Sequence, residues 1–250
     1  MKIEICCDSI ASARNAKIGG ADRIELCSAI NTGGVTPSHG IVKKVKEILN
    51  IPINVLIRPR PGNFCYSEEE FEIILSDIEF CKEMKVNGIV SGILLKNGRV
   101  DIERTKILLE KSYPIEFTFH RAIDNSFDYI KNIETLINLG VKRILTSGNY
   151  SSISKGLENL TQIQSLFGDK ITIMPGGGIN LKNIYSLIKI GFSEIHLTAS
   201  KFIEDDCYNN SNLKGMGHFE KNGKLGYKYA DATSIHDFRL LTYIRPSSGS

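Results

Sequence analysis

The chain has 250 residues, 42% of them hydrophobic and 24% charged, with 31 Lys and Arg against 28 Asp and Glu. This composition agrees with one folded domain, and no apolar run approaches the roughly 20 residues of a membrane-spanning helix. Basic residues are scattered along predicted helix faces, which argues against nucleic acid as a partner. We expect a single domain over residues 1–245 and a flexible tail or cloning remnant at 246–250.

The first residues, Met-Lys-Ile-Glu-Ile, enter a predicted strand directly. We therefore expect no signal peptide, a cytoplasmic location and no membrane partner. In that compartment the six cysteines should be thiols. The sequence leaves open whether the chain forms a homo-oligomer.

Short Ile, Val and Leu runs alternate with amphipathic stretches along the whole chain, which predicts strands alternating with helices. In chain order the pattern predicts a strand over 2–7, a helix over 10–18, a strand over 22–27, a helix over 38–49, a strand over 53–58, a helix over 67–84, a strand over 88–94, a helix over 101–111, a strand over 115–120, a helix over 126–139, a strand over 143–147, a helix over 151–167, a strand over 171–174, a helix over 181–190, a strand over 194–199 and a helix over 231–243.

Local signals mark the ends of these elements. Gly20, Gly140 and Gly191 each stand where a helix should stop shortly before a strand. Residues 67–70 form a capping box, and Asn180 is one of several expected N-caps. Eight strands and eight helices in this order predict a single (β/α)8 TIM barrel. An open doubly wound sheet is the rival, but its first turn would carry glycines, and residues 6–9 read Cys-Cys-Asp-Ser.

The segment 174–179, Met-Pro-Gly-Gly-Gly-Ile, follows a predicted strand and precedes a predicted helix. Backbone N–H groups of Gly176, Gly177 and Gly178 would then lie near the positive end of a helix dipole, which suits an anion. A plain tight turn is the alternative.

The period-two pattern of the strands predicts which side chains face the barrel axis. They include acidic, thiol and histidine side chains: Glu4, Cys6, Asp8, Glu25, Cys27, Arg58, Arg60, Glu116, Thr118, His120, Glu194, His196 and Thr198. A structural ion network with Arg23, Arg58 or Arg143 would explain the buried carboxylates, as would an error of one residue in the parity. A functional site is the other interpretation, because polar residues gather toward the strand ends where barrels build their sites. There we expect Asp8, Cys27, Arg58, Arg60, His120, Arg121, Asp124, Ser147, Gly148, the glycines at 176–178, His196 and Ser200.

Seven stretches of the chain form a specific set of motifs: EICCDS at 4–9, GGADRIELC at 19–27, GGVTPS at 33–38, IRPR at 57–60 with NFCYS at 63–67, TFHRA at 118–122 with Asp124, LTSG at 145–148 and MPGGGI at 174–179. Together these motifs resemble the CutC family of copper-homeostasis proteins. The resemblance implies a cytosolic (β/α)8 barrel associated with copper handling and able to bind Cu(I). One departure is Pro61, where relatives commonly have Gly, and it removes a backbone donor beside Arg60.

Cu(I) is soft and prefers thiolates, so a copper site needs cysteines that converge. Cys6 and Cys27 face inward from neighbouring predicted strands and are the candidate ligands; burial as small hydrophobes is the alternative. Cys65 is a weaker candidate, and Cys81 and Cys207 look incidental. The segment 201–228, with a hairpin expected at Asn222 and Gly223, would form either a lid or a loop.

Two functions follow. The first is a copper-homeostasis protein that binds Cu(I). The second is a lyase or isomerase acting on a small phosphorylated or carboxylated metabolite at the barrel mouth. Its candidate catalytic residues are Asp8, His120 and Asp124, and its candidate anion-binding residues are Arg58, Arg60, Ser147, Gly148, Gly176, Gly177, Gly178 and Ser200.

Overall fold

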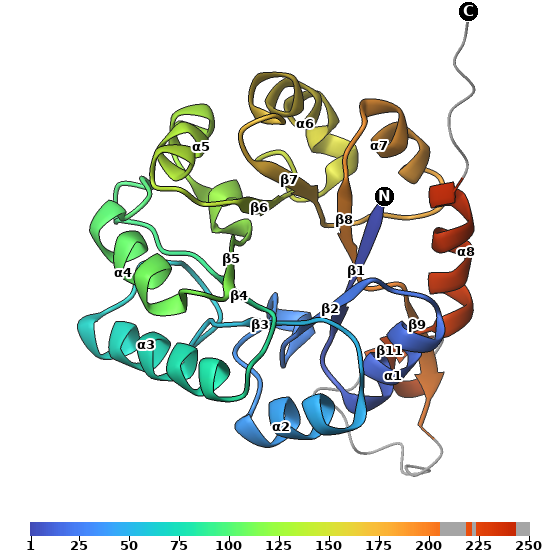
Figure 1. Cartoon of the computed structure of the whole chain (residues 1–250). Coiled ribbons are helices and arrows are strands. Elements are labelled where there is room, and N and C mark those ends of the chain that lie inside the picture. Colours follow the sequence, from blue (N-terminus) through green and yellow to red (C-terminus); the bar gives the residue numbers. More distant parts are fainter. Residues whose placement is uncertain (206–218, 222–223, 244–250) are drawn as a thin grey trace, which may run out of the picture.

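The computed structural model describes residues 1–205, 219–221 and 224–243. Within them a ring of parallel strands is surrounded by helices (Figure 1). The strands of the ring are β1 (Lys2–Cys7), β2 (Arg23–Leu26), β3 (Ile53–Leu56), β4 (Gly88–Ser91), β5 (Glu116–Phe119), β6 (Arg143–Thr146), β7 (Thr172–Pro175) and β8 (Glu194–Leu197). Each pairs with its neighbour in chain order, and β1 pairs with β8. A bridge between Gly176 and His196 joins β7 to β8, so the predicted (β/α)8 barrel is confirmed.

The described α-helices lie around the outside of the ring. They are α1 (Ile10–Ile18), α2 (His39–Ile48), α3 (Glu68–Glu83), α4 (Ile102–Ser112), α5 (Tyr129–Asn138), α6 (Ile153–Phe167), α7 (Ile184–Ile190) and α8 (Ala232–Tyr243). The predicted capping box is present, because Ser67 accepts from the Glu70 N–H and Glu70 from the Ser67 N–H. Gly140 and Gly191 follow α5 and α7 with φ of 86° and 92°, the left-handed region that glycine reaches without strain.

Two α-helices begin later than predicted. The helix α7 begins at Ile184, not near residue 181, because Asn180 does not cap it; the Asn180 side chain accepts instead from the Lys182 and Asn183 N–H groups in a turn. The helix α5 begins later than predicted because a short 3-10 helix, η2 (Arg121–Asn125), precedes it. A second such turn, η1 (Ile30–Thr32), follows β2.

Alternate side chains of each barrel strand face the helices or the barrel axis, and these two sides differ in polarity. Outward-facing residues such as Ile3, Ile5 and Ile24 are fully buried against the helices. Inward positions carry the predicted polar residues, and Glu4, Glu25 and His196 are all at least nine-tenths buried. The parity prediction is therefore correct, and the barrel axis is polar where the outer core is apolar.

A small antiparallel sheet extends the chain beyond the barrel. It consists of β9 (Ser200–Glu204), β10 (Phe219–Lys221) and β11 (Lys224–Ala230), in the order β10-β11-β9. Ala230 joins this sheet to α1, since its N–H donates to Ser12 and its carbonyl accepts from Asn15. The expected hairpin is present as the pairing of β10 with β11. The predicted turn at Asn222 and Gly223, the tail at 246–250 and Cys207 lie outside the described residues.

Candidate functional site

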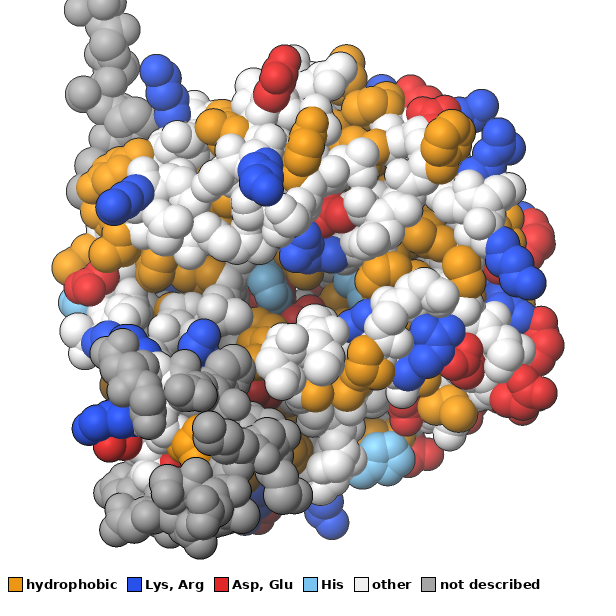
Figure 2. All heavy atoms as spheres, turned by 180° about the vertical axis from the view of Figure 1, so that it is seen from behind, with side chains coloured by type: hydrophobic (Ala, Val, Ile, Leu, Met, Phe, Trp, Pro, Cys, Tyr) orange, Lys and Arg blue, Asp and Glu red, His pale blue; other side chains and the backbone are white. Residues whose placement is uncertain are grey.

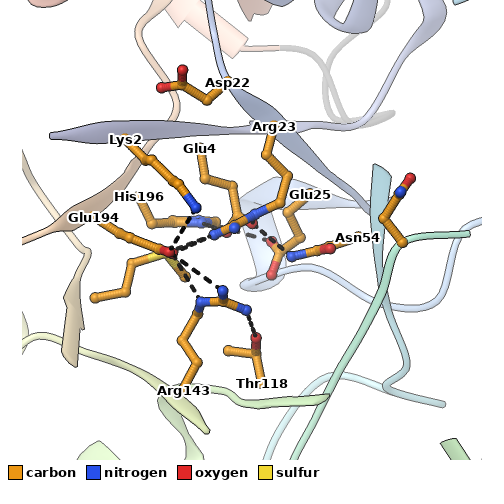
Figure 3. A network of polar contacts seen from close by, with 12 residues as sticks. Lys2, Glu4, Asp22, Arg23, Glu25, Asn54, Thr118, Arg143, Glu194 and His196 are labelled. Atoms are coloured by element: carbon orange, nitrogen blue, oxygen red, sulfur yellow. Dashed lines mark hydrogen bonds and ion pairs between the residues drawn. The ribbon is translucent and has the colours of Figure 1, made fainter. Parts of the chain in front are cut away.

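Arginine and glutamate side chains from five strands form an ion network inside the barrel (Figure 3). Arg23 Nε donates to Glu4 Oε2 at 2.5 Å and Arg23 Nη2 to Glu194 Oε2 at 2.7 Å. Arg143 contacts Glu194 at 2.8 Å and Glu116 at 3.0 Å. Glu116 and Glu194 are therefore part of a structural ion network, as one interpretation of the sequence expected, because their charges are already paired with arginines.

Glu4 connects this network to a histidine. Burial alone would raise the pKa of Glu4, but the hydrogen bond from His196 and the charge of Arg23 outweigh it and lower the pKa to about 2. Glu4 is thus a carboxylate that accepts from His196 Nδ1 at 2.8 Å. Because Nδ1 is the donor, His196 Nε2 is directed away from Glu4, and a carboxylate behind a histidine is the arrangement that orients metal-ligating histidines.

Two thiols lie beside His196. Cys6 Sγ is 3.6 Å from Cys27 Sγ and 3.3 Å from Glu25 Oε2, and Glu25 Oε2 is 3.8 Å from His196 Nε2. One ligand atom from each of Cys6, Glu25 and His196 lies within 4.8 Å of the others. These donors match a soft or borderline metal ion. We define this cluster of Cys6, Cys27, Glu25 and His196 as the thiol cluster.

Protonation opposes metal binding in the thiol cluster. The hydrogen bond with Cys27 and burial raise the pKa of the Cys6 thiol well above its ordinary value. Burial also raises the pKa of Glu25. Burial would lower the pKa of His196, but the charge of Glu25 and the bond to Glu4 raise it. A metal ion must therefore displace protons to bind.

The thiol cluster borders a cavity of about 240 Å³ at the end of the barrel where the strands have their carboxyl ends, which we call the mouth. Figure 2 shows a hollow in this face with histidine side chains inside it and a basic side chain at its edge. The lining residues come from strand ends and the loops that follow: Cys6, Glu25, Ile30, Gly33, Leu56, Arg58, Phe64, His120, Arg121, Leu145, Gly177, Gly178, Ile179, His196, Leu197 and Thr198.

The glycine loop lies at this cavity without a helix directly behind it. Gly177 and Gly178 have φ of 102° and 83° and line the cavity, whereas the Gly176 N–H is already bonded to Thr146 O at 2.9 Å. Five residues separate Gly178 from α7. The prediction that the glycines lie at the positive end of a helix dipole is therefore wrong, because the chain turns at 180–183 before α7 begins.

Asp124 occupies an anion-binding loop of its own. Its carboxylate accepts from the N–H groups of Ser147 and Asn149, at 2.9 and 3.0 Å, and from the hydroxyls of Thr146 and Ser147. The Gly148 N–H donates to Thr146 Oγ1. Asp124, Ser147 and Gly148 are thus brought together behind Arg121 of the cavity lining, and their hydrogen bonds hold the loop after β6.

Three further predicted residues are not part of the cavity lining. The Arg60 guanidinium is 2.5 Å from Glu70 and also holds the carbonyls of Asn63 and Cys65. Asp8 is half-buried, and burial raises its pKa. Ser200 is exposed at the start of β9. The sequence predicted all three at the mouth because each follows a strand end, but it could not give their side-chain partners.

Two members of the thiol cluster were not proposed as ligands from the sequence. The alternation of side chains along the strands had predicted that Glu25 and His196 face the barrel axis, so the sequence did carry a sign that they could join the site. Their distance from Cys6 depends on the stagger of β1 against β2 and β8, which pairs Cys6 with Glu25 and Glu4 with His196. Phe64 and Ile30 reach the cavity from loops, where the sequence carries no such signal.

Fold and site together define a TIM barrel with a thiol-bordered cavity at its mouth. A sequence profile of the CutC family matches residues 1–201, and the chain belongs to this family. It is 44% identical to a CutC family protein of Klebsiella pneumoniae strain 342 over 204 residues, 82% of each chain. It is 38% identical to a human copper homeostasis protein cutC homolog over 240 residues, 96% of this chain and 88% of that protein. The crystal structure of a CutC protein from Streptococcus agalactiae superimposes with a TM-score of 0.75 at 31% identity, covering 79% of this chain and 98% of that one.

No helix in the described part of the chain combines the length and apolar character needed to cross a membrane.

Proposed function

We propose that this protein acts in copper homeostasis by binding Cu(I) through the thiolates of Cys6 and Cys27. The observation that carries the proposal is the distance of 3.6 Å between their Sγ atoms on neighbouring strands. Soft thiolate ligands select Cu(I) over harder ions, and both sulfurs can reach one ion at this separation. His196, held by Glu4, supports the proposal as a neighbouring nitrogen donor.

The same geometry favours a reducing compartment such as the cytoplasm. Two thiols 3.6 Å apart need only a small movement to form a disulfide, whose sulfurs are about 2.05 Å apart. Oxidation would remove both ligands, and cytosolic thiols are kept reduced. The proposed function therefore requires that the pair remains reduced until copper binds.

The enzyme alternative receives less support. It needs Arg60 and Asp124 at the substrate, but the first is paired with Glu70 and the second is enclosed by the loop after β6. Ser200, its proposed oxyanion donor, is exposed on β9. A lyase or isomerase built from these residues is accordingly not proposed.

The test is Cu(I) affinity under a competing chelator for the reduced protein and two double variants. We expect Cys6→Ser with Cys27→Ser to weaken binding by well over tenfold, more than ~1.4 kcal/mol, because each tenfold step equals that energy. The matched control is Cys7→Ala with Cys81→Ala, two thiols that are also buried but belong to the outer core.

Circular dichroism should show that all three proteins are folded before their affinities are compared. Binding should also weaken as the pH falls, because both thiols must lose their protons. Equal affinities for the wild type and both double variants would refute the proposal.

A further inference from the structure

Arg58 is a buried cation whose charge no carboxylate neutralises in the described structure. Its side chain follows β3, and the residue is 5% exposed. Nη1 donates to the carbonyls of Thr32 and Gly34, and Nη2 donates to Gly62 O at 2.8 Å. These partners are neutral, and among the described residues no acidic group forms an ion pair with Arg58. A buried charge without a counter-ion is unfavourable, so an anion at this position would be stabilised.

Arg58 also has an unused donor. Its Nε is buried and makes no hydrogen bond of ordinary length in the described structure, although the Tyr66 hydroxyl, which is also without a partner there, lies close enough to the guanidinium for Arg58 to oppose the rise that burial causes in the tyrosine pKa. His120 Nε2 is likewise buried without a hydrogen bond among the described residues. His120 Nδ1 accepts from the Ala122 N–H at 3.2 Å, so in the neutral ring the proton is on Nε2. Burial and the charge of Arg58 lower the pKa of His120 to about 3, which keeps the ring neutral and Nε2 a donor. Two unpartnered N–H donors therefore belong to residues that line one cavity.

The cavity suits a ligand with a small charged end and an apolar body. Leu56, Leu145 and Leu197 contribute apolar surface to its lining. Its volume of about 240 Å³ is below the roughly 300 Å³ at which drug-sized ligand sites begin, so the occupant must be small.

One side chain packs against both residues, Arg58 and His120. The Phe64 ring lies 4.9 Å from Arg58 Cζ and 4.9 Å from the centre of the His120 ring, and it also lines the cavity. Both N–H groups are buried, so a ligand in the cavity would reach them by turning this half-buried ring aside. Ring rotations of this kind are small movements that ligand binding commonly selects.

We propose that the mouth cavity binds a small aliphatic monocarboxylate, with its two oxygens accepting from Arg58 Nε and His120 Nε2. Two acceptor oxygens match two donors, and one negative charge matches the one unpaired guanidinium. A phosphate dianion fits less well, because His120 is neutral and the other basic side chains of the lining, Arg121 and His196, are already paired with Asp124 and Glu4. The apolar body lies against the leucines of the lining.

This site is distinct from the proposed copper site in its ligand atoms, although Cys6 borders the same cavity. The carboxylate would be held by nitrogen donors of residues that follow β3 and β5, whereas Cu(I) would be held by one thiolate of β1 and one of the residue that follows β2. A metal-free measurement therefore tests the carboxylate site whether or not the protein binds copper.

The experiment is an NMR titration of the reduced, metal-free full chain that follows the Arg58 Nε–H signal. The probes are 3-methylbutanoate, its uncharged amide and inorganic phosphate. We expect a saturable shift with the carboxylate and at least tenfold weaker binding of the amide and of phosphate. Arg58→Gln should weaken carboxylate binding at least about tenfold, more than ~1.4 kcal/mol. Arg60→Gln is the matched control on the same loop, because Arg60 is paired with Glu70 outside the cavity lining.

His120→Phe provides a second variant, since it keeps an aromatic ring and removes the Nε2 donor together with the Nδ1 acceptor of the Ala122 N–H, and it should weaken carboxylate binding several-fold. This variant keeps the test decisive if Arg58→Gln fails to fold through loss of its loop contacts. Equal binding of carboxylate and amide, no saturable shift with any probe, or an unchanged affinity in His120→Phe would overturn the proposal. Tighter binding of phosphate than of carboxylate would overturn the assignment of the ligand class.

Discussion

Replacing Glu4 by Gln should remove a pH-dependent part of the stability of this barrel. Glu4 is fully buried and accepts hydrogen bonds from Arg23, Asn54 and His196. Its pKa is lowered from 4.5 to about 2 in the folded state. At about 1.4 kcal/mol per pKa unit, this shift corresponds to about 3 kcal/mol of folding free energy.

The sign follows from the lowered pKa. The carboxylate stabilises the fold fully above its unfolded pKa of about 4.5, and this contribution is lost as the pH falls through the folded pKa of about 2. A glutamine cannot ionise and resembles the protonated acid. We therefore expect Glu4→Gln to lower the free energy of unfolding by about 3 kcal/mol at pH 7, and the difference from wild type to shrink between about pH 5 and pH 2.

The assay is urea unfolding at a series of pH values, with the difference between wild type and variant as the readout. Glu116→Gln is the matched control, because Glu116 also bonds to an arginine of the network but its side chain is 65% exposed. An exposed pair of this kind contributes at most about 1 kcal/mol, so the control should change little. A Glu4→Gln difference that stays constant with pH, or one no larger than that of Glu116→Gln, would refute the reasoning.

Two further predictions concern the mouth and the loop after β6. The His120 ring should remain neutral in an NMR titration down to about pH 4, because burial lowers its pKa to about 3, and a midpoint near 6.5 would contradict this placement. Gly156→Ala should lower the free energy of unfolding by more than ~2 kcal/mol in urea, because a Cβ there would lie 2.0 Å from Ser147 O. Gly40→Ala, whose added Cβ would meet nothing closer than 3.9 Å, should not destabilise the protein, and equal losses in both variants would exclude a steric cause.

The barrel could be predicted from the sequence because its determinants are local. A strand of this barrel alternates apolar outward and polar inward side chains, and a helix on the outside has an apolar stripe, so each element carries its own period. The same parity correctly assigned Glu4, Cys6, Glu25 and His196 to the interior. Alternation of side chains is a property of any extended backbone and needs no knowledge of the neighbouring strands.

Side-chain partners could not be predicted in this way, because they depend on which loops meet. Asp124 was expected at the site, and only the fold showed that the loop after β6 encloses it. Arg58 and Arg60 look equivalent in the sequence, yet Arg60 is paired with Glu70, whereas Arg58 has no counter-ion among the residues that the structure describes.

The sequence by itself determined the class of fold, the inward face of each strand and the pair of thiols that face each other across β1 and β2. The tertiary structure decided the 3.6 Å distance between those thiols, the bond that holds His196 to Glu4 and the cavity beside them. The physical reason is that distances across the barrel are set by strand stagger and by the packing of distant loops. Those contacts join residues far apart in the chain, and no local pattern encodes them.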